Sequence, residues 1–305
     1  MARVIVTGVG GFIGAHVARR FIAEGYAVTG VDDLSTGKRS NVPAGVDFIE
    51  ADLADPATMQ KLPRDSQAIL HLAGQSSGEI SFDDPVSDLE KNTVSTLNLV
   101  RHGLETRLPR FVYASSMSVY GSVPDEPVPE SRAAAPLSCY GVGKLAAENY
   151  LRVYQKQLPF VAMRMFNVYG PGQDLSNLRQ GMVSIYLAQA LNGGNIVVKG
   201  SLERFRDCIY VDDVVEAWFR ATTSEMAAGR ALNIGTGVRT TVGDLLERIC
   251  KQVVGSRYEI HGGTPGDQSG IYADNAQLRR VLGMERFTPL ASGLEKFVDW
   301  ARTIR

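Results

Sequence analysis

Tyr140 and Lys144 lie four residues apart in the stretch SCYGVGKLAAENY, residues 138–150, which is rich in helix formers. Residues at positions i and i+4 share one helical face, so the ammonium can approach the phenol. A free tyrosine has a pKa of about 10, and a nearby positive charge lowers it. The spacing therefore predicts a base that removes a proton from an alcohol. Chance pairs of this kind also occur on helix surfaces, so the interpretation depends on the rest of the chain.

Glycines follow the first apolar run of the chain. Gly8, Gly11 and Gly14 lie in GVGGFIG, directly after the strand pattern RVIVT and before the helical pattern AHVARRFIAEGY. Glycines let the backbone approach a pyrophosphate, and the free N–H groups of a helix N-terminus stabilise the negative charge. A tight turn alone can use the same residues, but a strand before it and a helix after it favour a dinucleotide site.

Acidic residues end the next two strand patterns. Asp32 closes AVTGVDD, near the distance after the glycines at which an acid binds the ribose hydroxyls of a dinucleotide. A carboxylate there repels a 2′-phosphate and favours NAD, whereas Lys38 and Arg39 just beyond it can accept NADP. A solvated turn is the alternative role for Asp32. Asp52 ends the third strand pattern and can meet the adenine edge.

Two serines, Ser115 and Ser116, end the strand pattern RFVYASS. Ligands bind at the carboxyl ends of strands in open α/β sheets, so a hydroxyl there can share a substrate proton with Tyr140. Serines are frequent at strand ends, and this prediction also depends on the partners.

Strand and helix patterns alternate through the first half of the chain. This order predicts βαβ units, right-handed crossovers and a Rossmann-like, doubly wound parallel sheet of the α/β class. The expected strands are 3–7, 27–33, 46–53, 68–74, 110–116 and 160–167, with helical stretches at 56–62, 85–107 and 141–157.

The pattern changes after residue 167, where a loop-like segment spans 169–181. We expect residues 1–166, joined by 209–235, to form an NAD-binding domain. Residues 167–208 and 236–305 are expected to form a smaller substrate-binding lobe, interwoven with the first domain because no linker separates them.

Composition restricts the class of protein. The 305 residues are 44% hydrophobic and 21% charged, with a formal net charge of −1, which argues against nucleic acid or an anionic membrane as the main partner. No apolar stretch approaches the ~20 residues of a membrane span, and no signal segment precedes the first strand. Cys139, Cys208 and Cys250 lack the spacing of metal ligands. We expect a reduced cytoplasmic protein without a metal site.

The motifs together resemble the extended short-chain dehydrogenase/reductase family, in its nucleotide-sugar epimerase and dehydratase branch. The resemblance extends over nearly the whole chain, and its motifs are GVGGFIG, VDDLSTG, ADLAD, HLAGQ, YASSMSVYG, YGVGK, RMFNVYGPGQ, RDCIYVDDVVEA, NIGTG and PGD…YAD. It implies a catalytic set of Ser116, Tyr140 and Lys144.

The resemblance also implies the cofactor, the substrate contacts and the assembly. Substrate diphosphate would meet Asn167 and Arg206, with Ser116 also touching the substrate, and a homodimer would form through helices 85–107 and 141–157. Tightly held NAD would be contacted by Gly8, Gly11, Phe12, Ile13, Gly14, Asp32, Asp33, Leu34, Ser35, Thr36, Gly37, Asp52, Leu53, Leu72, Ala73, Gly74, Gln75, Asn92, Tyr140, Lys144 and Phe166.

Two positions in the serine motif separate the reactions of this branch. Dehydratases and decarboxylases resembling this chain carry an acid before V-Y-G, where this sequence has Met117 and Ser118. A thioether transfers no proton, so the resemblance favours 4-epimerisation of a nucleotide sugar through a transient 4-keto intermediate. A reductase of 4-keto sugars that consumes NAD(P)H and a catalytically idle NAD-binding sensor are the alternatives.

Several residues depart from the family pattern. Thr264 stands where relatives place an arginine, and Lys199, Ser201 and Leu202 replace the usual residues of a loop expected beside the nucleotide base. UDP, dTDP, GDP and CDP sugars therefore all stay open. Ile271 lies near the position that admits or excludes N-acetyl groups, and its size settles neither outcome.

Overall fold

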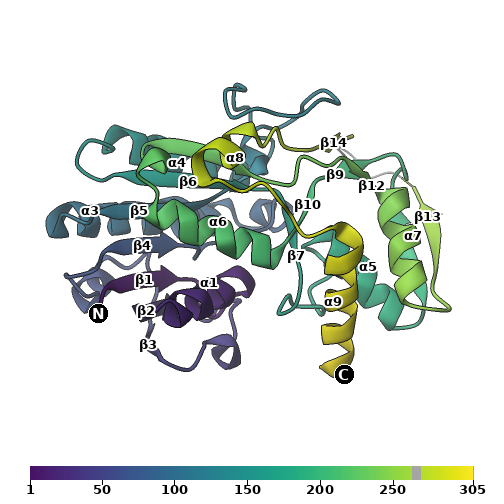
Figure 1. Cartoon of the computed structure of the whole chain (residues 1–305), viewed down its shortest axis with the longest axis horizontal. Coiled ribbons are helices and arrows are strands. Elements are labelled where there is room, and N and C mark those ends of the chain that lie inside the picture. The colour runs from purple at the N-terminus through teal and green to yellow at the C-terminus, as the bar shows by residue number, and fades with distance from the viewer. Residues whose placement is uncertain (263–268, 305) are drawn as a thin grey trace.

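The computed structural model describes residues 1–262 and 269–304 (Figure 1). The strands are β1 (Arg3–Thr7), β2 (Ala27–Asp32), β3 (Val46–Glu50), β4 (Ala68–His71), β5 (Arg110–Ser116), β6 (Phe160–Met165), β7 (Asn167–Tyr169), β8 (Asn195–Lys199), β9 (Phe205–Arg206), β10 (Cys208–Tyr210), β11 (Arg230–Ile234), β12 (Thr240–Thr241), β13 (Arg257–His261) and β14 (Gly270–Ile271). The α-helices are α1 (Phe12–Ala23), α2 (Pro85–Leu89), α3 (Ser95–Thr106), α4 (Cys139–Val153), α5 (Met182–Leu191), α6 (Val211–Thr223), α7 (Val242–Gln252), α8 (Ala276–Leu282) and α9 (Leu290–Thr303).

Seven strands form one parallel sheet in the order β11-β6-β5-β4-β1-β2-β3. Its register places Val4 of β1 between Val28 of β2 and Ala68 of β4. The strand order reverses between β1 and β4, which is the switch point where ligands bind in such sheets. The predicted Rossmann-like, doubly wound fold is confirmed.

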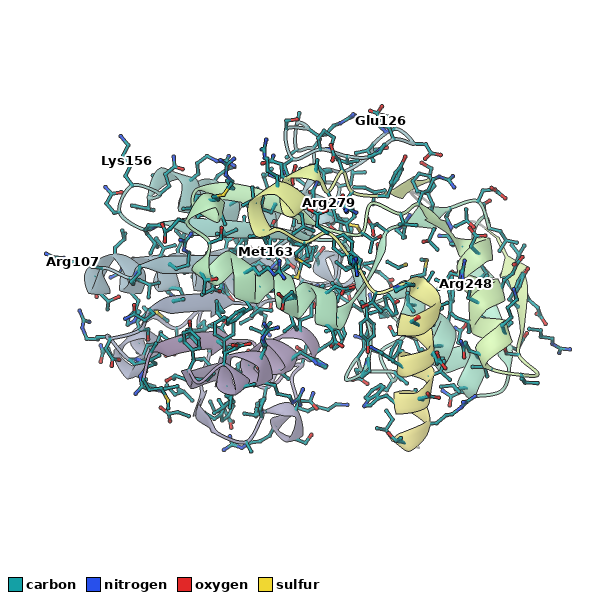
Figure 2. All side chains as sticks on the ribbon, in the orientation of Figure 1. Arg107, Glu126, Lys156, Met163, Arg248 and Arg279 are labelled. Atoms are coloured by element: carbon teal, nitrogen blue, oxygen red, sulfur yellow. The ribbon has the colours of Figure 1, made fainter. Side chains whose placement is uncertain are left out.

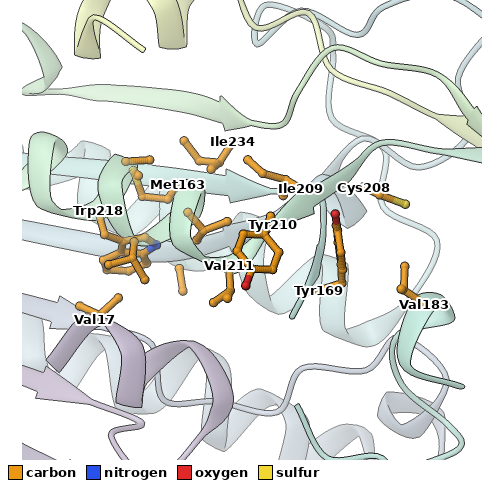
Figure 3. Packing of buried hydrophobic residues seen from close by; sticks show 14 of the residues in the cluster. Val17, Met163, Tyr169, Val183, Cys208, Ile209, Tyr210, Val211, Trp218 and Ile234 are labelled. Carbon is orange, nitrogen blue, oxygen red and sulfur yellow. The ribbon is translucent and has the colours of Figure 1, made fainter. Parts of the chain in front are cut away.

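Both faces of the sheet are buried, as the continuous apolar strands require. Val4 and Val6 of β1 pack on the side of α1 and α6, whereas Ile5 between them packs with residues of α3 and α4 on the other side. Figure 3 shows the first of these cores, in which Trp218 of α6 lies beside Met163 of β6. Charged side chains such as Lys156 and Arg107 project from the periphery in Figure 2.

A smaller group of elements lies beside one end of the sheet, where α5, α7, α9 and β13 gather in Figure 1. The chain leaves the sheet after β6, forms β7 to β10, and returns to the sheet edge through α6 and β11. This topology interweaves the two groups of elements, and their division into two domains stays an interpretation.

Some element boundaries differ from those expected. α4 begins two residues earlier than predicted because Ser138 caps it, with its Oγ accepting a hydrogen bond from the Gly141 N–H. The stretch 85–107 is divided by a π-helix, Glu90–Val94 (η4). The stretch expected at 56–62 is the 3₁₀ helix Pro56–Lys61, for which Asp55 supplies the cap. β3 and β4 end at Glu50 and His71, where the chain turns toward the site.

A buried ion pair fixes α4 against the sheet. Glu148 of α4 receives two hydrogen bonds from Arg164 of β6, at 2.9 Å from Nε and 2.7 Å from Nη2, and another from the Ser115 hydroxyl of β5. Arg164 Nη1 also donates to Tyr120 Oη at 2.9 Å. Breaking one partner of such a pair leaves an uncompensated buried charge, so the network resists any shift of α4.

We predict that Glu148→Gln lowers the free energy of unfolding by about 3–5 kcal/mol, because Arg164 keeps its buried charge without a counter-charge. Urea unfolding measures the loss. The matched control is Glu24→Gln, which removes an exposed partner of Arg20 and should cost about 0–1 kcal/mol. Equal losses in the two variants would contradict this role of the buried pair.

Candidate active site

The glycine turn between β1 and α1 leaves no space for side chains. A Cβ on Gly14 would lie 2.0 Å from the Gly8 carbonyl oxygen, and one on Gly8, whose φ is +70°, would lie 2.7 Å from the Ala73 nitrogen. Gly11 is the N-cap of α1 and supplies no capping side chain. The first N–H groups of α1 thus remain available to a phosphate. This turn fits a dinucleotide.

Asp32 ends β2 as a buried carboxylate beside this turn. Its Oδ2 accepts a hydrogen bond from the Gly10 N–H at 2.9 Å, and its Oδ1 accepts one from the Leu34 N–H at 2.8 Å. Burial raises the pKa of Asp32, while these two backbone bonds oppose the rise. Asp32 is therefore not an acid of a solvent-exposed turn, which was the alternative role considered for it.

The cations needed for the NADP alternative already have partners. Lys38 Nζ lies 3.4 Å from the carboxylate of Asp174, and Arg39 Nη1 lies 3.0 Å from that of Glu50. In each pair the carboxylate offsets the positive charge of the lysine or arginine, which would otherwise attract the 2′-phosphate of NADP. With the negative charge of Asp32 nearby, the geometry favours NAD.

A cavity of about 490 Å³ opens at the carboxyl ends of the strands. The predicted cofactor-binding residues that line it are Gly8, Gly11, Phe12, Ile13, Gly14, Asp32, Asp33, Ser35, Thr36, Gly37, Asp52, Leu53, Leu72, Ala73, Gly74, Gln75, Tyr140 and Lys144. The cavity thus brings together most of the residues that the sequence suggested, and their individual roles stay predictions.

Three predicted cofactor contacts do not line this cavity. Leu34 contributes its backbone N–H to Asp32. Asn92 lies behind Gly74, where a Cβ would be 2.5 Å from the Asn92 Oδ1. Phe166 is buried in a small apolar cluster with Tyr120 and Ile271. Asn92 Oδ1 is buried and has no hydrogen-bond partner in the protein, which is consistent with a ligand-facing role.

Part of the cavity wall was missing from the sequence-based prediction. The loop 171–181 lines it, together with Trp300 of α9 and Ile304. His16 Nε2 donates to the Pro171 carbonyl at 2.8 Å, and Gln180 Nε2 donates to Ser76 Oγ at 2.7 Å. The only sequence signal for this wall was the motif RMFNVYGPGQ, since no periodicity marks a loop that folds back over a site.

The predicted catalytic residues meet at one side of the cavity. Ser116 ends β5, and its Oγ donates to Ser118 Oγ at 3.2 Å while accepting from the Ser118 N–H. Tyr140 is in the first turn of α4, and a hydrogen bond joins its side chain to Ser116. Lys144 Nζ lies 5.5 Å from the ring centroid of Tyr140 and 5.1 Å from that of Tyr113.

Burial dominates the electrostatics of this group. It raises the pKa of Tyr140 to about 12, although the hydrogen bond with Ser116 opposes the rise. Burial also lowers the pKa of Lys144 to about 8, and the Asp88 carboxylate opposes this fall. In the protein alone, loss of hydration therefore determines the net direction of the pKa of Tyr140, and the expected lowering of this pKa by Lys144 stays a prediction.

Two of the predicted substrate contacts, Asn167 and Arg206, lie on short strands of different sheets and do not line this cavity. The Asn167 N–H of β7 donates to the Asp207 carbonyl at 3.0 Å, and its Oδ1 is buried without a partner in the protein. Arg206 of β9 is the neighbour of Asp207 and stands opposite Ile271 of β14, which is buried. The position of Thr264 is outside the described residues.

Neither a metal-binding group nor a membrane-spanning helix is found among the described residues. Among the described residues, no group of His, Cys, Asp and Glu side chains is arranged to hold a metal ion. None of the helices within 1–262 and 269–304 is long and apolar enough to cross a membrane.

Known proteins share both sequence and fold with this chain. Residues 4–235 match the model of the NAD dependent epimerase/dehydratase family. A UDP-glucose 4-epimerase of Mycolicibacterium smegmatis is 35% identical, with 98% of each chain covered. The UDP-glucose 4-epimerase of Thermotoga maritima, solved with UDP-glucose, has a TM-score of 0.95 and 32% identity over 99% of each chain.

A second solved structure includes the cofactor. The UDP-glucose 4-epimerase of Thermus thermophilus, in complex with NAD, has a TM-score of 0.90 and 33% identity, covering 98% of this chain and 99% of its own. The glycine turn, Asp32 and the cavity of the present chain fit the same cofactor. The resemblance seen in the motifs is thereby confirmed, and the chain belongs to the NAD dependent epimerase/dehydratase family, with NAD as its cofactor.

Proposed function

We propose that the protein is a nucleotide-sugar 4-epimerase. The observation that carries this proposal is that Ser116, Tyr140 and Lys144 meet beside a dinucleotide cavity, while Met117 and Ser118 next to them offer no carboxyl group. Such a site can oxidise and re-reduce an alcohol, but it lacks the acid and base that loss of water requires. The two UDP-glucose 4-epimerases with the same fold and about one third sequence identity support the same reaction.

In this mechanism, Tyr140 takes the proton of the C4 hydroxyl and returns it after the 4-keto sugar has turned over. In this step the Ser116 hydroxyl turns from Ser118 and donates its hydrogen bond to the phenolate, and Lys144 adds positive charge beside the ring. Bound NAD supplies the oxidation and reduction of C4 and a further positive charge. The buried position of Tyr140 excludes water from the proton transfer.

We place the substrate among the UDP-hexoses, because the relatives with the same fold are named for UDP-glucose. Asn167 of β7 and Arg206 of β9 are the proposed contacts of its diphosphate. The three cysteines are free, which fits a cytoplasmic enzyme.

We also propose a homodimer. Val86 and Leu89 of α2 and Val142 and Val153 of α4 are exposed large apolar residues on two helices that pack side by side. In the proposed dimer these residues, with Phe82 just before α2, contribute to a surface that a second copy of the chain would cover.

The activity test is NMR of the purified protein with UDP-, dTDP-, GDP- and CDP-hexoses, without added cofactor. Interconversion of C4 epimers without net NADH would establish the reaction and identify the nucleotide. Turnover only when NAD(P)H is supplied and consumed would replace the proposal by the reductase. Bound NAD with no turnover of any hexose would favour the sensor.

We predict that Tyr140→Phe lowers kcat by at least about 100-fold, because the phenol is the proton acceptor, while bound NAD is retained. The measurement compares turnover with the NAD released from denatured enzyme. Tyr150→Phe is the matched control, since this tyrosine lies exposed on the same helix and should keep full activity. Retained turnover in Tyr140→Phe would refute the assignment.

A second prediction concerns the choice of dinucleotide. Asp32→Ser should reduce the preference for NAD over NADP by about tenfold, because the charge that repels a 2′-phosphate is removed. Thermal shift titrations of cofactor-free protein with each dinucleotide measure this ratio. Asp47→Ser removes an exposed acid of β3 and should leave the ratio unchanged; a similar change in both variants would assign the effect to net charge.

A third prediction tests the assembly. Sedimentation at micromolar concentration should give a species of about 66 kDa, twice the 33.1 kDa chain. Val153→Asp should shift it to the monomer, because a charge would be buried in the contact. Val254→Asp, on an exposed residue elsewhere, is the control. A wild-type monomer would refute the proposed contact.

A further inference from the structure

Asp88 is a buried carboxylate next to the catalytic group that the proposed mechanism does not use. It lies in α2 and is only 2% exposed. Its Oδ1 accepts a hydrogen bond from Asn92 Nδ2 at 3.1 Å, and its Oδ2 lies 3.5 Å from where a Cβ on Gly143 would be. Asp88 is thus enclosed between the π-helix η4 and the first turns of α4.

An enclosed carboxylate needs compensation, because removing a charge from water costs several kcal/mol. Asn92 supplies one hydrogen bond, and Lys144 supplies the opposite charge: each of Asp88 and Lys144 favours the ionised form of the other. Lys144 is itself 3% exposed. Two buried groups of opposite sign therefore depend on each other.

Asn92 connects the two groups in space. Its Nδ2 donates to Asp88, and its Oδ1 lies on the side of Gly74. A Cβ on Gly74 would be 2.5 Å from Asn92 Oδ1 and 3.5 Å from Lys144 Nζ, so both atoms border the same small space. The hydrogen bond that the Asn92 amide donates to Asp88 determines that the Asn92 Oδ1 faces this space.

We infer that Asp88 is a positioning residue that holds Lys144 in its ammonium form beside Tyr140 and orients Asn92. The inference rests on the proposed epimerase function for its catalytic meaning, but not for the charge of Lys144. Asp88 acts through Lys144 and Asn92 and is not itself placed in contact with the substrate.

The other ionisable groups around Lys144 carry little net negative charge. His71 of β4 is neutral, since burial lowers its pKa to about 3, and burial raises the pKa of Tyr113 of β5 so that this phenol also stays neutral. Glu148 of α4 is paired with Arg164. In contrast to these three neighbours, Asp88 has a negative charge that no arginine or other cation of the described residues offsets apart from Lys144.

Asp88→Asn removes the negative charge but keeps the size of the side chain and its hydrogen bond, because the new amide oxygen can still accept the bond from Asn92. Without the carboxylate, the ammonium form of Lys144 loses its attraction and the phenolate of Tyr140 loses a repulsion, so the pKa of each falls. We expect a fall of about one unit for Lys144. In the pH profile of kcat, the rise that follows ionisation of Tyr140 and the fall that follows deprotonation of Lys144 should therefore both move to lower pH.

The experiment titrates the NAD-loaded enzyme labelled with [ε-¹³C]lysine by NMR, with Lys144→Met identifying the signal. The variants are Asp88→Asn and, should that protein not fold, Asp88→Ser. Glu90→Gln is the matched control, since it removes an exposed acid two residues away. The pH profile of kcat is recorded on the same proteins.

A lower titration midpoint of Lys144 in the Asp88 variant, but not in Glu90→Gln, supports the inference. An unchanged midpoint would overturn it, even if activity falls, because a merely structural role lowers the rate without moving the titration. An equal shift in both variants would also overturn it. If the midpoint moves while the wild type epimerises no sugar, the inference stands and the proposed function fails.

Discussion

The position of α4 is the constraint on which the active site depends. Tyr140 and Lys144 come from this helix, whereas Ser116 ends β5, so the three residues meet only if helix and strand keep a fixed distance. The bidentate Arg164–Glu148 pair and the bond from Ser115 to Glu148 supply that restraint two helical turns from Tyr140. Because all these groups are buried, a small displacement of α4 would leave a buried charge without its partner. The position of α4 relative to β5 and β6 is therefore rigid.

Two kinds of constraint shape the cofactor side of the site. The glycine turn is steric: Cβ atoms on Gly8 and Gly14 would collide with backbone, and the chain thereby approaches the place of the pyrophosphate. The ribose side is electrostatic, with Asp32 buried and the nearby cations Lys38 and Arg39 paired with carboxylates. The glycine turn leaves space for a dinucleotide, and the charges around Asp32 favour NAD, which has no 2′-phosphate, over NADP.

The sequence predicted the sheet well because parallel strands buried on both faces leave continuous apolar runs between helical patterns. It also predicted the glycine turn, the place of Asp32 at the end of β2 and the meeting of Ser116, Tyr140 and Lys144, because the signals for these residues are local. It could not predict the wall formed by 171–181 and Trp300, since these contacts join segments far apart in the chain. The raised pKa of Tyr140 was missed for a related reason: spacing shows that Lys144 is near, but only the fold shows how completely both are buried.

The burial of this pair couples catalysis to the cofactor. In the protein alone, loss of hydration favours the neutral forms of both Tyr140 and Lys144, so the site contains little of the phenolate that the proposed mechanism needs. A positive charge brought to this cavity stabilises the phenolate, and by linkage ionisation of Tyr140 strengthens the binding of that charge. Oxidised NAD brings such a charge. An enzyme that returns its cofactor unchanged gains from this reciprocity, because the state ready to remove a proton is also the state that holds the dinucleotide most tightly.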